Sequence, residues 1–302
     1  MTNNMNNKDY LKVFLDSQAL SDDSTELKEL QKIRGEVEEL LRDEFDSSPT
    51  IKYGGSKAKG TLVRESYDLD IICYFPRDDD ENAETLEEVF NNVRKALETK
   101  YTVVTKTQAL RLMGLSDKAD FHVDVVPGRY VDDAKSDTFL YRASGDKKRL
   151  KTNLDTHIKH VRDSGVSDAI KVLKVWRTRK SLSVRTFVLE LAVIELLKDH
   201  KKDSLEEQLK HVLTELRDNV DDITIKDPAN PDGNDLSEAF DDNVRQILAL
   251  VAKDTLTTVA ASGWEGVFGA LPEDSKESRV EALKRAAAGI SAPTKPWCNR
   301  LV

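Results

Sequence analysis

The stretch Tyr53-Gly54-Gly55-Ser56, followed twelve residues after Ser56 by Asp68-Leu69-Asp70-Ile71, decides how the chain folds and what it can do. A third aspartate, Asp124, lies in a separate apolar run, Phe121-His122-Val123-Asp124-Val125-Val126. Side chains two apart on a strand point to the same face, so Asp68 and Asp70 share one face. Asp124 on a neighbouring strand would complete a group of carboxylates, whose oxygens are the ligands that Mg²⁺ prefers.

The Gly-Gly-Ser turn before the aspartates predicts a place for phosphate. Gly54 and Gly55 let the backbone pass close to phosphate oxygens, and the Ser56 hydroxyl with the following amides can hold the β- and γ-phosphates. Nucleotidyl transfer attacks the α-phosphorus of an NTP and expels pyrophosphate, and two Mg²⁺ ions commonly hold the attacking and leaving oxygens. Alone, either motif is more often a surface turn or a solvated strand edge. Together they predict nucleotidyl transfer, with Asp124 helping to deprotonate the incoming hydroxyl.

Composition limits the alternatives. The 302 residues suffice for two domains, and 39% hydrophobic with 33% charged residues is typical of a globular protein. The formal net charge of -9 argues against a broad basic surface for long nucleic acid. Cys73 and Cys298 give no disulfide framework or zinc spacing, which suits a reducing cytosol. The longest apolar stretch, 187–197, is too short and too charged to span a bilayer. We therefore expect a cytoplasmic protein without membrane association.

Periodicity predicts a mixed first region and a helical second region. The apolar spacing predicts a helix over 24–45, a strand over 68–75, a helix over 86–97, one strand over 101–112 and another over 119–126. After about residue 156 the pattern is almost all helical, with helices expected over 169–179, 186–197, 202–217, 233–253 and 279–288. A composition shift between 142 and 156 divides the chain into 1–150 and 151–302.

Two lysines in the second region are candidates for nucleotide binding. Lys171 and Lys174 are three apart on a predicted helix, so they should project together and could reach a triphosphate. The alternative is a solvated helix face, which is the more frequent meaning of such a pair.

The motifs carry a family resemblance. Gly55-Ser56, Lys59-Gly60-Thr61, Asp68-Leu69-Asp70 and Val123-Asp124-Val125-Val126-Pro127 resemble the catalytic pattern of the DNA-polymerase-β-like nucleotidyltransferases. The later segments 151–153, 171–176, 186–190 and 227–231 look like the helical half of the oligoadenylate-synthase-like branch. The whole, over roughly residues 50 to 235, is similar to the bacterial CD-NTases, relatives of the vertebrate DNA sensor cGAS.

The resemblance implies an α+β fold: a polymerase-β-like lobe with a mixed β-sheet, a C-terminal all-helical lobe, and the active site in the cleft between them. It implies that Asp68, Asp70 and Asp124 bind two Mg²⁺ ions, with Mn²⁺ as an alternative. It also implies that Ser56 and Lys174 contact the triphosphate, and that Thr186 replaces a serine near the nucleotide.

The resemblance further implies that ATP or other NTPs are joined into a cyclic di- or trinucleotide. Such products act as second messengers in anti-phage defence and trigger a separate effector, and a regulatory protein partner is a further expectation. The sequence gives neither the bases nor the ring size nor the linkage. Tyr130 and Tyr141 could stack on a base or simply pack.

Two other functions are open on the sequence. One is a CCA-adding or poly(A)-type nucleotidyltransferase acting on RNA ends, against which stand the negative net charge and the lack of an evident extra RNA-binding domain. The other is a catalytically silent nucleotide-binding regulatory module, against which stands the presence of all three carboxylates. Incorporation of labelled ATP into tRNA would favour the first, and NTP binding without turnover would favour the second.

Overall fold

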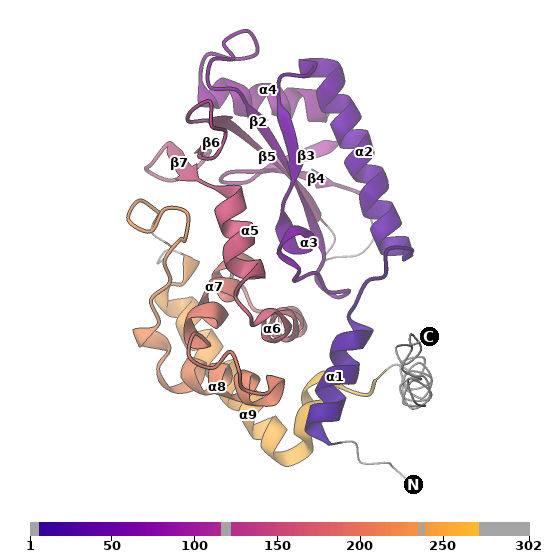
Figure 1. The fold of residues 1–302 in the computed structure, drawn as a ribbon, viewed down its shortest axis with the longest axis vertical. Coiled ribbons are helices and arrows are strands. Elements are labelled where there is room, and N and C mark those ends of the chain that lie inside the picture. Colours follow the sequence, from indigo (N-terminus) through magenta and orange to yellow (C-terminus); the bar gives the residue numbers. More distant parts are fainter. Residues whose placement is uncertain (1–5, 116–121, 235, 237–238, 272–302) are drawn as a thin grey trace, which may run out of the picture.

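The chain folds into two lobes that face each other across a cleft (Figure 1). The computed structural model describes residues 6–115, 122–234, 236 and 239–271. One lobe is built on a β-sheet and the other on helices, so the predicted α+β class is confirmed.

The sheet of the first lobe is mixed. Its strands run in the order β1 (Thr50–Tyr53), β2 (Asp68–Phe75), β5 (His122–Tyr130), β4 (Leu110–Met113) and β3 (Thr102–Thr105). A branch adds β6 (Thr138–Tyr141) beside β5, and β7 (Arg149–Thr152) beside β6. The central pair, β2 and β5, is parallel, whereas β1–β2, β3–β4 and β4–β5 are antiparallel. The predicted aspartates therefore lie on the two strands at the centre of the sheet.

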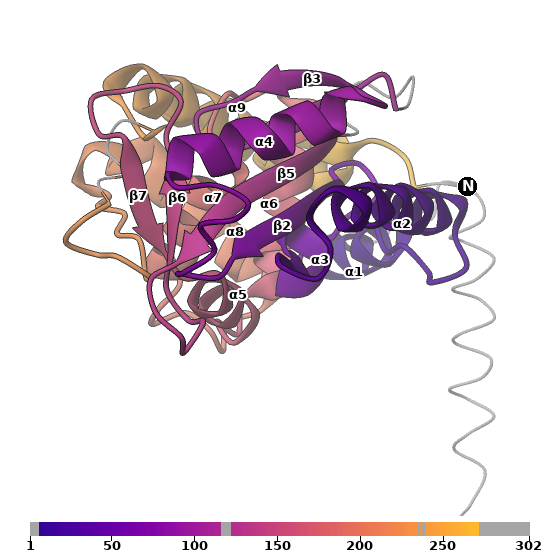
Figure 2. The ribbon, with the colours of Figure 1, turned by 90° about the horizontal axis from the view of Figure 1, so that it is seen from above.

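Two helices cover one face of the sheet. They are α2 (Thr25–Phe45) and α4 (Leu86–Glu98), and Figure 2 shows α4 lying across the strands. The α4 helix begins with a capping box between Thr85 and Glu88, and Ser24 caps α2. Their apolar faces share one core with alternate residues of β2 and β5, including Ile71, Cys73, Val123 and Val125. The opposite sheet face, which carries the aspartates, is left toward the second lobe.

The second lobe is helical, as predicted. It contains α5 (Leu154–Arg162), α6 (Ser167–Arg179), α7 (Thr186–Leu196), α8 (Leu205–Asp218), the short 3₁₀ helix η1 (Val220–Asp222) and α9 (Asp242–Phe268). The apolar α7 is buried nearly all round, which agrees with its sequence. The long α9 is kinked at Gly263, whose φ of 66° is left-handed.

Two segments of the first region pack with the second lobe. The first helix, α1 (Asn7–Ser17), places Tyr10, Leu11, Val13 and Phe14 in the helical core. Val63, which follows the short helix α3 (Gly55–Lys59), joins the same core. The division at about residue 150 therefore describes the order of the chain, whereas α1 and Val63 pack across it.

Two expectations from periodicity need correction, and two strands were not expected. The single strand expected over 101–112 is a hairpin of β3 and β4, because Lys106 turns the chain and its amide donates to the carbonyl of Ala109 (2.8 Å). The helix expected over 233–253 begins at Asp242 and continues to Phe268, and β6 and β7 were not foreseen. The helix expected over 279–288 lies outside the described residues. Within the part of the chain that the structure describes, no helix combines the length and apolar character needed to cross a membrane.

Candidate functional site

The predicted aspartates share one face of the central strand pair. In the parallel register of β2 and β5, Asp70 lies beside Asp124 and Asp68 beside His122. Because side chains alternate along each strand, Asp70 and Asp124 stand on the face that α2 and α4 leave uncovered. The side chain of Asp68 lies outside the description, so contacts can be given for the other two.

Asp124 has a partner that the sequence analysis did not consider. Arg111, its neighbour in the β4–β5 register, donates from Nε to Oδ1 (2.8 Å) and from Nη2 to Oδ2 (2.7 Å). The side chains are 25% and 19% exposed, so this paired guanidinium and carboxylate are largely enclosed. A two-pronged contact of this kind fixes the orientation of the carboxylate.

The aspartate face has the donor chemistry of a divalent-cation site. Asp70 and Asp124 present carboxylate oxygens from adjacent strands, which suits Mg²⁺ or Mn²⁺. The described side chains do not include that of Asp68. Among them, no group of three His, Cys, Asp or Glu residues has the arrangement of a metal site. The predicted two-metal site therefore remains a prediction that depends on all three aspartates.

Asp70 opens into a cleft of about 560 Å³ between the lobes. The first lobe contributes Gly54, Gly55 and the continuation of the aspartate face, and the helical lobe contributes side chains of α5 and α7 and of the loop before α9. Concave, partly apolar clefts with a few converging polar groups are the usual form of small-molecule sites. The cleft and Asp70 thus meet where the resemblance expects the active site.

The turn after β1 follows the predicted geometry. Gly54 donates its amide to the carbonyl of Asp70 (2.9 Å), and a Cβ on Gly54 would lie 3.3 Å from Leu154 Cδ1 and 3.5 Å from Asp70 Cβ. Gly55 has a φ of 74°, in the left-handed region that favours glycine. The two glycines therefore let the backbone pass directly beside the acidic face.

Ser56 meets one of the two predicted lysines. Lys174 is 1% exposed and donates from Nζ to Ser56 Oγ (2.7 Å) and to the carbonyl of Thr61 (2.9 Å). Lys171 is 27% exposed and pairs with Asp168 (3.2 Å). The two lysines therefore have different partners, one buried and one at the surface, and the nucleotide contacts predicted for them remain predictions.

A buried glutamate extends this contact between the lobes. Glu190 of α7 has no exposed surface, and its carboxylate accepts hydrogen bonds from Lys59 Nζ and Thr61 Oγ1, each at 2.8 Å. The Lys59 ammonium also lies 4.7 Å from the ring centroid of Phe187, and both residues line the cleft. The turn that carries Ser56 is thereby held by α6 and α7. We call the five residues that make these contacts the front tie: Ser56, Lys59, Thr61, Lys174 and Glu190.

Thr186 stands at the first position of α7 and is half-buried. Its neighbours Arg185 and Phe187 line the cleft. Thr186 is not among the residues that line the cleft, and its predicted contact with the nucleotide remains a prediction.

A histidine and an aspartate lie on the helical wall of the cleft. His157 Nε2 is 2.6 Å from Oδ1 of the buried Asp227, and its ring centroid is 4.6 Å from that of Phe187. Burial raises the pKa of Asp227, but hydrogen bonds from His157 and Asn234 outweigh it, so that pKa lies below its ordinary value. The carboxylate thus stays ionised and anchors the loop after η1 to α5.

Neither tyrosine considered for base stacking is presented to the cleft. Tyr130 is buried and packs edge-on against Tyr74, with 5.6 Å between ring centroids. Tyr141 packs against Phe90 at 5.4 Å. Both have packing roles, whereas the rings of Phe187, Tyr74 and His157 line the cleft.

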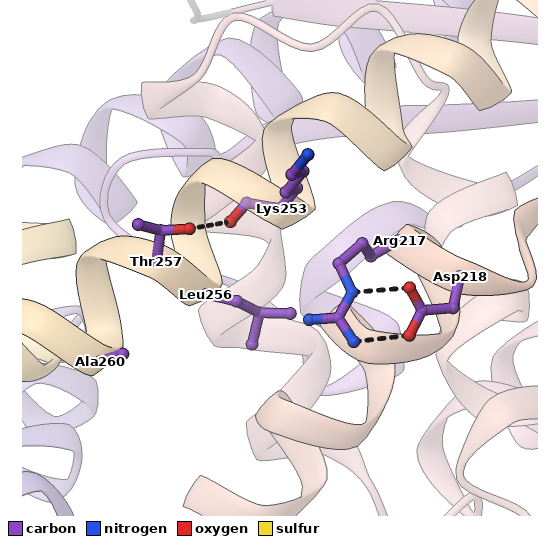
Figure 3. A pocket seen from close by; sticks show the side chains of 6 residues that line it. All are labelled: Arg217, Asp218, Lys253, Leu256, Thr257 and Ala260. Atoms are coloured by element: carbon purple, nitrogen blue, oxygen red, sulfur yellow. Dashed lines mark hydrogen bonds and ion pairs between the residues drawn. The ribbon is translucent and has the colours of Figure 1, made fainter.

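A second hollow of about 610 Å³ lies between α8 and α9 (Figure 3). Two of its charged residues, Arg217 and Asp218, pair with each other, at 2.7 and 2.5 Å. None of the predicted site residues lines it, so we do not connect it with the chemistry.

Comparison with known proteins agrees with this geometry. The family described as "Second Messenger Oligonucleotide or Dinucleotide Synthetase domain" matches residues 5–164, more than half of the chain. The search of curated proteins gives no match.

Solved structures show the same fold. CdnC of E. coli MS115-1 with ATP aligns with a TM-score of 0.63 at 20% identity, covering 88% of this chain and 98% of that chain. The same CdnC in complex with HORMA-deltaN gives 0.63 and 20%, covering 89% and 99%. The CD-NTase CdnG of Bradyrhizobium diazoefficiens with GTP gives 0.67 and 13%, covering 87% and 96%.

The family match covers the β1 turn, both aspartate strands and the first helix of the second lobe, and the resemblance stated from the motifs is confirmed. The chain belongs to the family of second messenger oligonucleotide or dinucleotide synthetases, which are nucleotidyltransferases of the CD-NTase type.

Proposed function

We propose that this protein joins NTPs into a cyclic di- or trinucleotide second messenger, by attack of a ribose hydroxyl on an NTP α-phosphate with release of pyrophosphate. The observation that carries the proposal is the acidic face of β2 and β5 beside the Gly54-Gly55-Ser56 turn, where Asp70 faces the cleft between the lobes. Neither feature alone is specific, but their juxtaposition is what nucleotidyl transfer requires.

Each residue has a distinct part in this proposal. Asp68, Asp70 and Asp124 would hold two divalent cations, which when bound neutralise charge on the phosphates and activate the attacking hydroxyl. Gly55 and Ser56 would contact the triphosphate, and Lys174 would hold Ser56 in place through the bond observed between them. Asp124 would accept the proton of the hydroxyl, since each of its oxygens keeps acceptor capacity beyond the bond from Arg111.

The two nucleotides would lie along the cleft. Its walls offer the aromatic ring of Phe187 for a base and the cationic side chains of Lys59, Arg142 and Arg185 for phosphates. CdnC is solved with ATP and CdnG with GTP, which supports NTPs as the substrate class here.

The test is a product assay. Purified protein is incubated with all four NTPs and Mg²⁺ or Mn²⁺, the mixture is treated with phosphatase, and mass spectrometry identifies what survives. A cyclic di- or trinucleotide is expected. If no such product forms across metals and pH, with any activator supplied, the proposal is wrong. Transfer of labelled AMP to tRNA in the same conditions would instead support the RNA-end alternative.

The product would act through a separate effector in anti-phage defence, in the cytoplasm. The complex of CdnC with HORMA-deltaN supports the idea that a protein partner also regulates this chain. Synthesis measured with and without candidate partners would test that part separately.

A further inference from the structure

We propose that Arg111 is a resident counter-ion of Asp124 that competes with the divalent cation and so lowers the metal affinity of the cleft. The inference rests on the proposed function only in taking Asp124 as a metal ligand. It concerns a residue that neither the motifs nor the family resemblance singles out.

The sheet itself brings the two groups together. Arg111 and Asp124 are paired residues of the antiparallel strands β4 and β5, and Asp124 and Asp70 are paired residues of β5 and β2. The order across the sheet is therefore cation, carboxylate, carboxylate, all on one face. The strands fix this order, so Arg111 is held beside Asp124 by backbone pairing as well as by its own contact.

The geometry of the contact gives the competition. Arg111 reaches both oxygens of Asp124 at once, Oδ1 from Nε (2.8 Å) and Oδ2 from Nη2 (2.7 Å). Two parallel bonds of this kind take the open side of the carboxylate, which a cation also needs for bidentate coordination. A cation must therefore displace the guanidinium or accept coordination through one remaining lone pair.

The environment makes the competition effective. The pair is mostly enclosed, with side chains 25% and 19% exposed, so water and salt screen it less than a surface pair. The positive charge of Arg111 also repels an arriving cation at short range. Arg111 thus balances the charge of the metal-free face, and raises the cation concentration at which that face becomes loaded.

The experiment measures metal binding without nucleotide or turnover. Full-length protein is stripped with EDTA and dialysed, and Mn²⁺ is titrated while the signal of free Mn²⁺ is followed by electron paramagnetic resonance. Arg111→Met removes the guanidinium and keeps much of the side-chain length, and Arg111→Lys keeps the charge but not the fork. Arg149→Met is the matched control, because Arg149 lies in the same sheet with its guanidinium 4.7 Å from the ring centroid of Phe139.

Arg111→Met should bind Mn²⁺ about tenfold more tightly than the wild type, the equivalent of one charge-assisted hydrogen bond. Arg111→Lys should bind more tightly than the wild type by a smaller factor, and Arg149→Met should stay within about twofold. Thermal unfolding in EDTA verifies that each variant is folded. If Arg111→Met does not fold, the comparison of Arg111→Lys with the wild type tests the inference.

Equal or weaker Mn²⁺ binding by the folded Arg111 variant would overturn the inference and make Arg111 an orienting partner of Asp124. Absence of Mn²⁺ binding by both the wild type and the variant would overturn it as well. Failure of the proposed function is recognised separately. In that case the wild type makes no nucleotide product, while the change in Mn²⁺ affinity is still measured.

Discussion

The two walls of the cleft present their functional groups from different secondary structure, strands in one lobe and helices in the other. The wall from the first lobe is a strand face with Asp70 and a glycine turn, and it also carries the cationic side chains of Lys59 and Arg142. The wall from the helical lobe carries Arg185, Phe187 and His157, and the imidazole of His157 contacts the buried Asp227. Asp70 is therefore placed by a strand and Phe187 by a helix, whereas cationic side chains reach the cleft from both lobes.

This difference assigns different tasks to the lobes. A strand pair fixes its side chains through the register of the backbone, which suits groups that must converge within a few ångströms. Helices present longer side chains that need partners of their own to be held in position. The front tie supplies those partners, since Lys174 and Glu190 of the helical lobe hold the turn of the first lobe.

The largest effect should come from the strand wall. Asp70→Asn keeps the shape of the side chain but removes the charge that a cation needs, so product formation should fall by about a thousandfold or more. Mass spectrometry of the reaction with NTPs measures the product. The midpoint temperature of thermal unfolding should be unchanged or slightly raised, because one of several neighbouring carboxylates has lost its charge.

Asp155→Asn is the control for Asp70→Asn. Asp155 is an exposed carboxylate on α5 that pairs with Lys52 at 3.3 Å. Its loss should leave synthesis within about twofold of the wild type. Synthesis retained by Asp70→Asn would move the chemistry to another place on the molecule.

The front tie should show the next largest effect. Glu190→Gln leaves Lys59 without its buried counter-charge, and breaking such a pair from one side costs about 3 kcal/mol in the free energy of unfolding. Product formation should fall by about a hundredfold, because small displacements of a positioned group cost that much. Urea unfolding and initial rates of synthesis measure the two quantities.

Two further variants separate stability from positioning. Adding Lys59→Met to Glu190→Gln removes the stranded charge and should recover most of the lost stability, while synthesis stays low. Glu195→Gln removes an exposed carboxylate of the same helix, which pairs with Lys198, and should change neither quantity. If Glu190→Gln synthesises at the wild-type rate, the front tie serves stability alone.

The same contrast explains what the sequence could reveal. The shared face of Asp68 and Asp70 follows from an alternation of two residues, and the separate run around Asp124 identifies the neighbouring strand. The burial of α7 follows from its apolar composition alone. These are local patterns; the structure has the two strands and the buried α7, and the shared site of the aspartates remains a prediction.

Partners that arise from the fold were not predictable. Arg111 contacts Asp124 because the chain turns at Lys106 and pairs β4 with β5. The single strand expected over 101–112 does not contain that turn, so it does not predict the pairing. Glu190 meets Lys59 across 131 positions of sequence, and His157 meets Asp227 across 70. One signal was present: a glutamate inside the apolar run of α7 must find a buried partner.

The stability that Asp227 gives to the helical lobe should depend on pH. The pKa of Asp227 is lowered from its ordinary value near 3.8, so its ionised form stabilises the fold above that pH. The contribution is lost as the pH falls below about 4 and through the lowered pKa. Asp227→Asn should cost about 1–2 kcal/mol at pH 7 and flatten the dependence of urea unfolding between pH 5 and 3. Equal slopes for wild type and variant would contradict this assignment.

The smallest effect is expected at a second contact between the lobes, which also involves α6. Arg179 of α6 holds Glu65 with bonds of 2.7 Å from Nε and 2.5 Å from Nη2, and Gln18 donates to the same carboxylate. Burial raises the pKa of Glu65, but these bonds and the charge of Arg179 outweigh it, so the pKa lies below its ordinary value. With side chains about one third exposed, the pair resembles a surface salt bridge more than the front tie does.

Glu65→Gln should therefore cost about 0.5–1 kcal/mol of stability at pH 7 and change synthesis by less than about twofold. Glu36→Gln is the matched control, since Glu36 has similar exposure and pairs with Lys100 within the first lobe. Urea unfolding and initial rates measured side by side decide the comparison. A tenfold loss of synthesis in Glu65→Gln, with Glu36→Gln unaffected, would mean that both contacts between the lobes position the cleft. The front tie would then not be distinguished by its burial. Exposure would no longer separate a contact that aligns the site from one that only stabilises the fold.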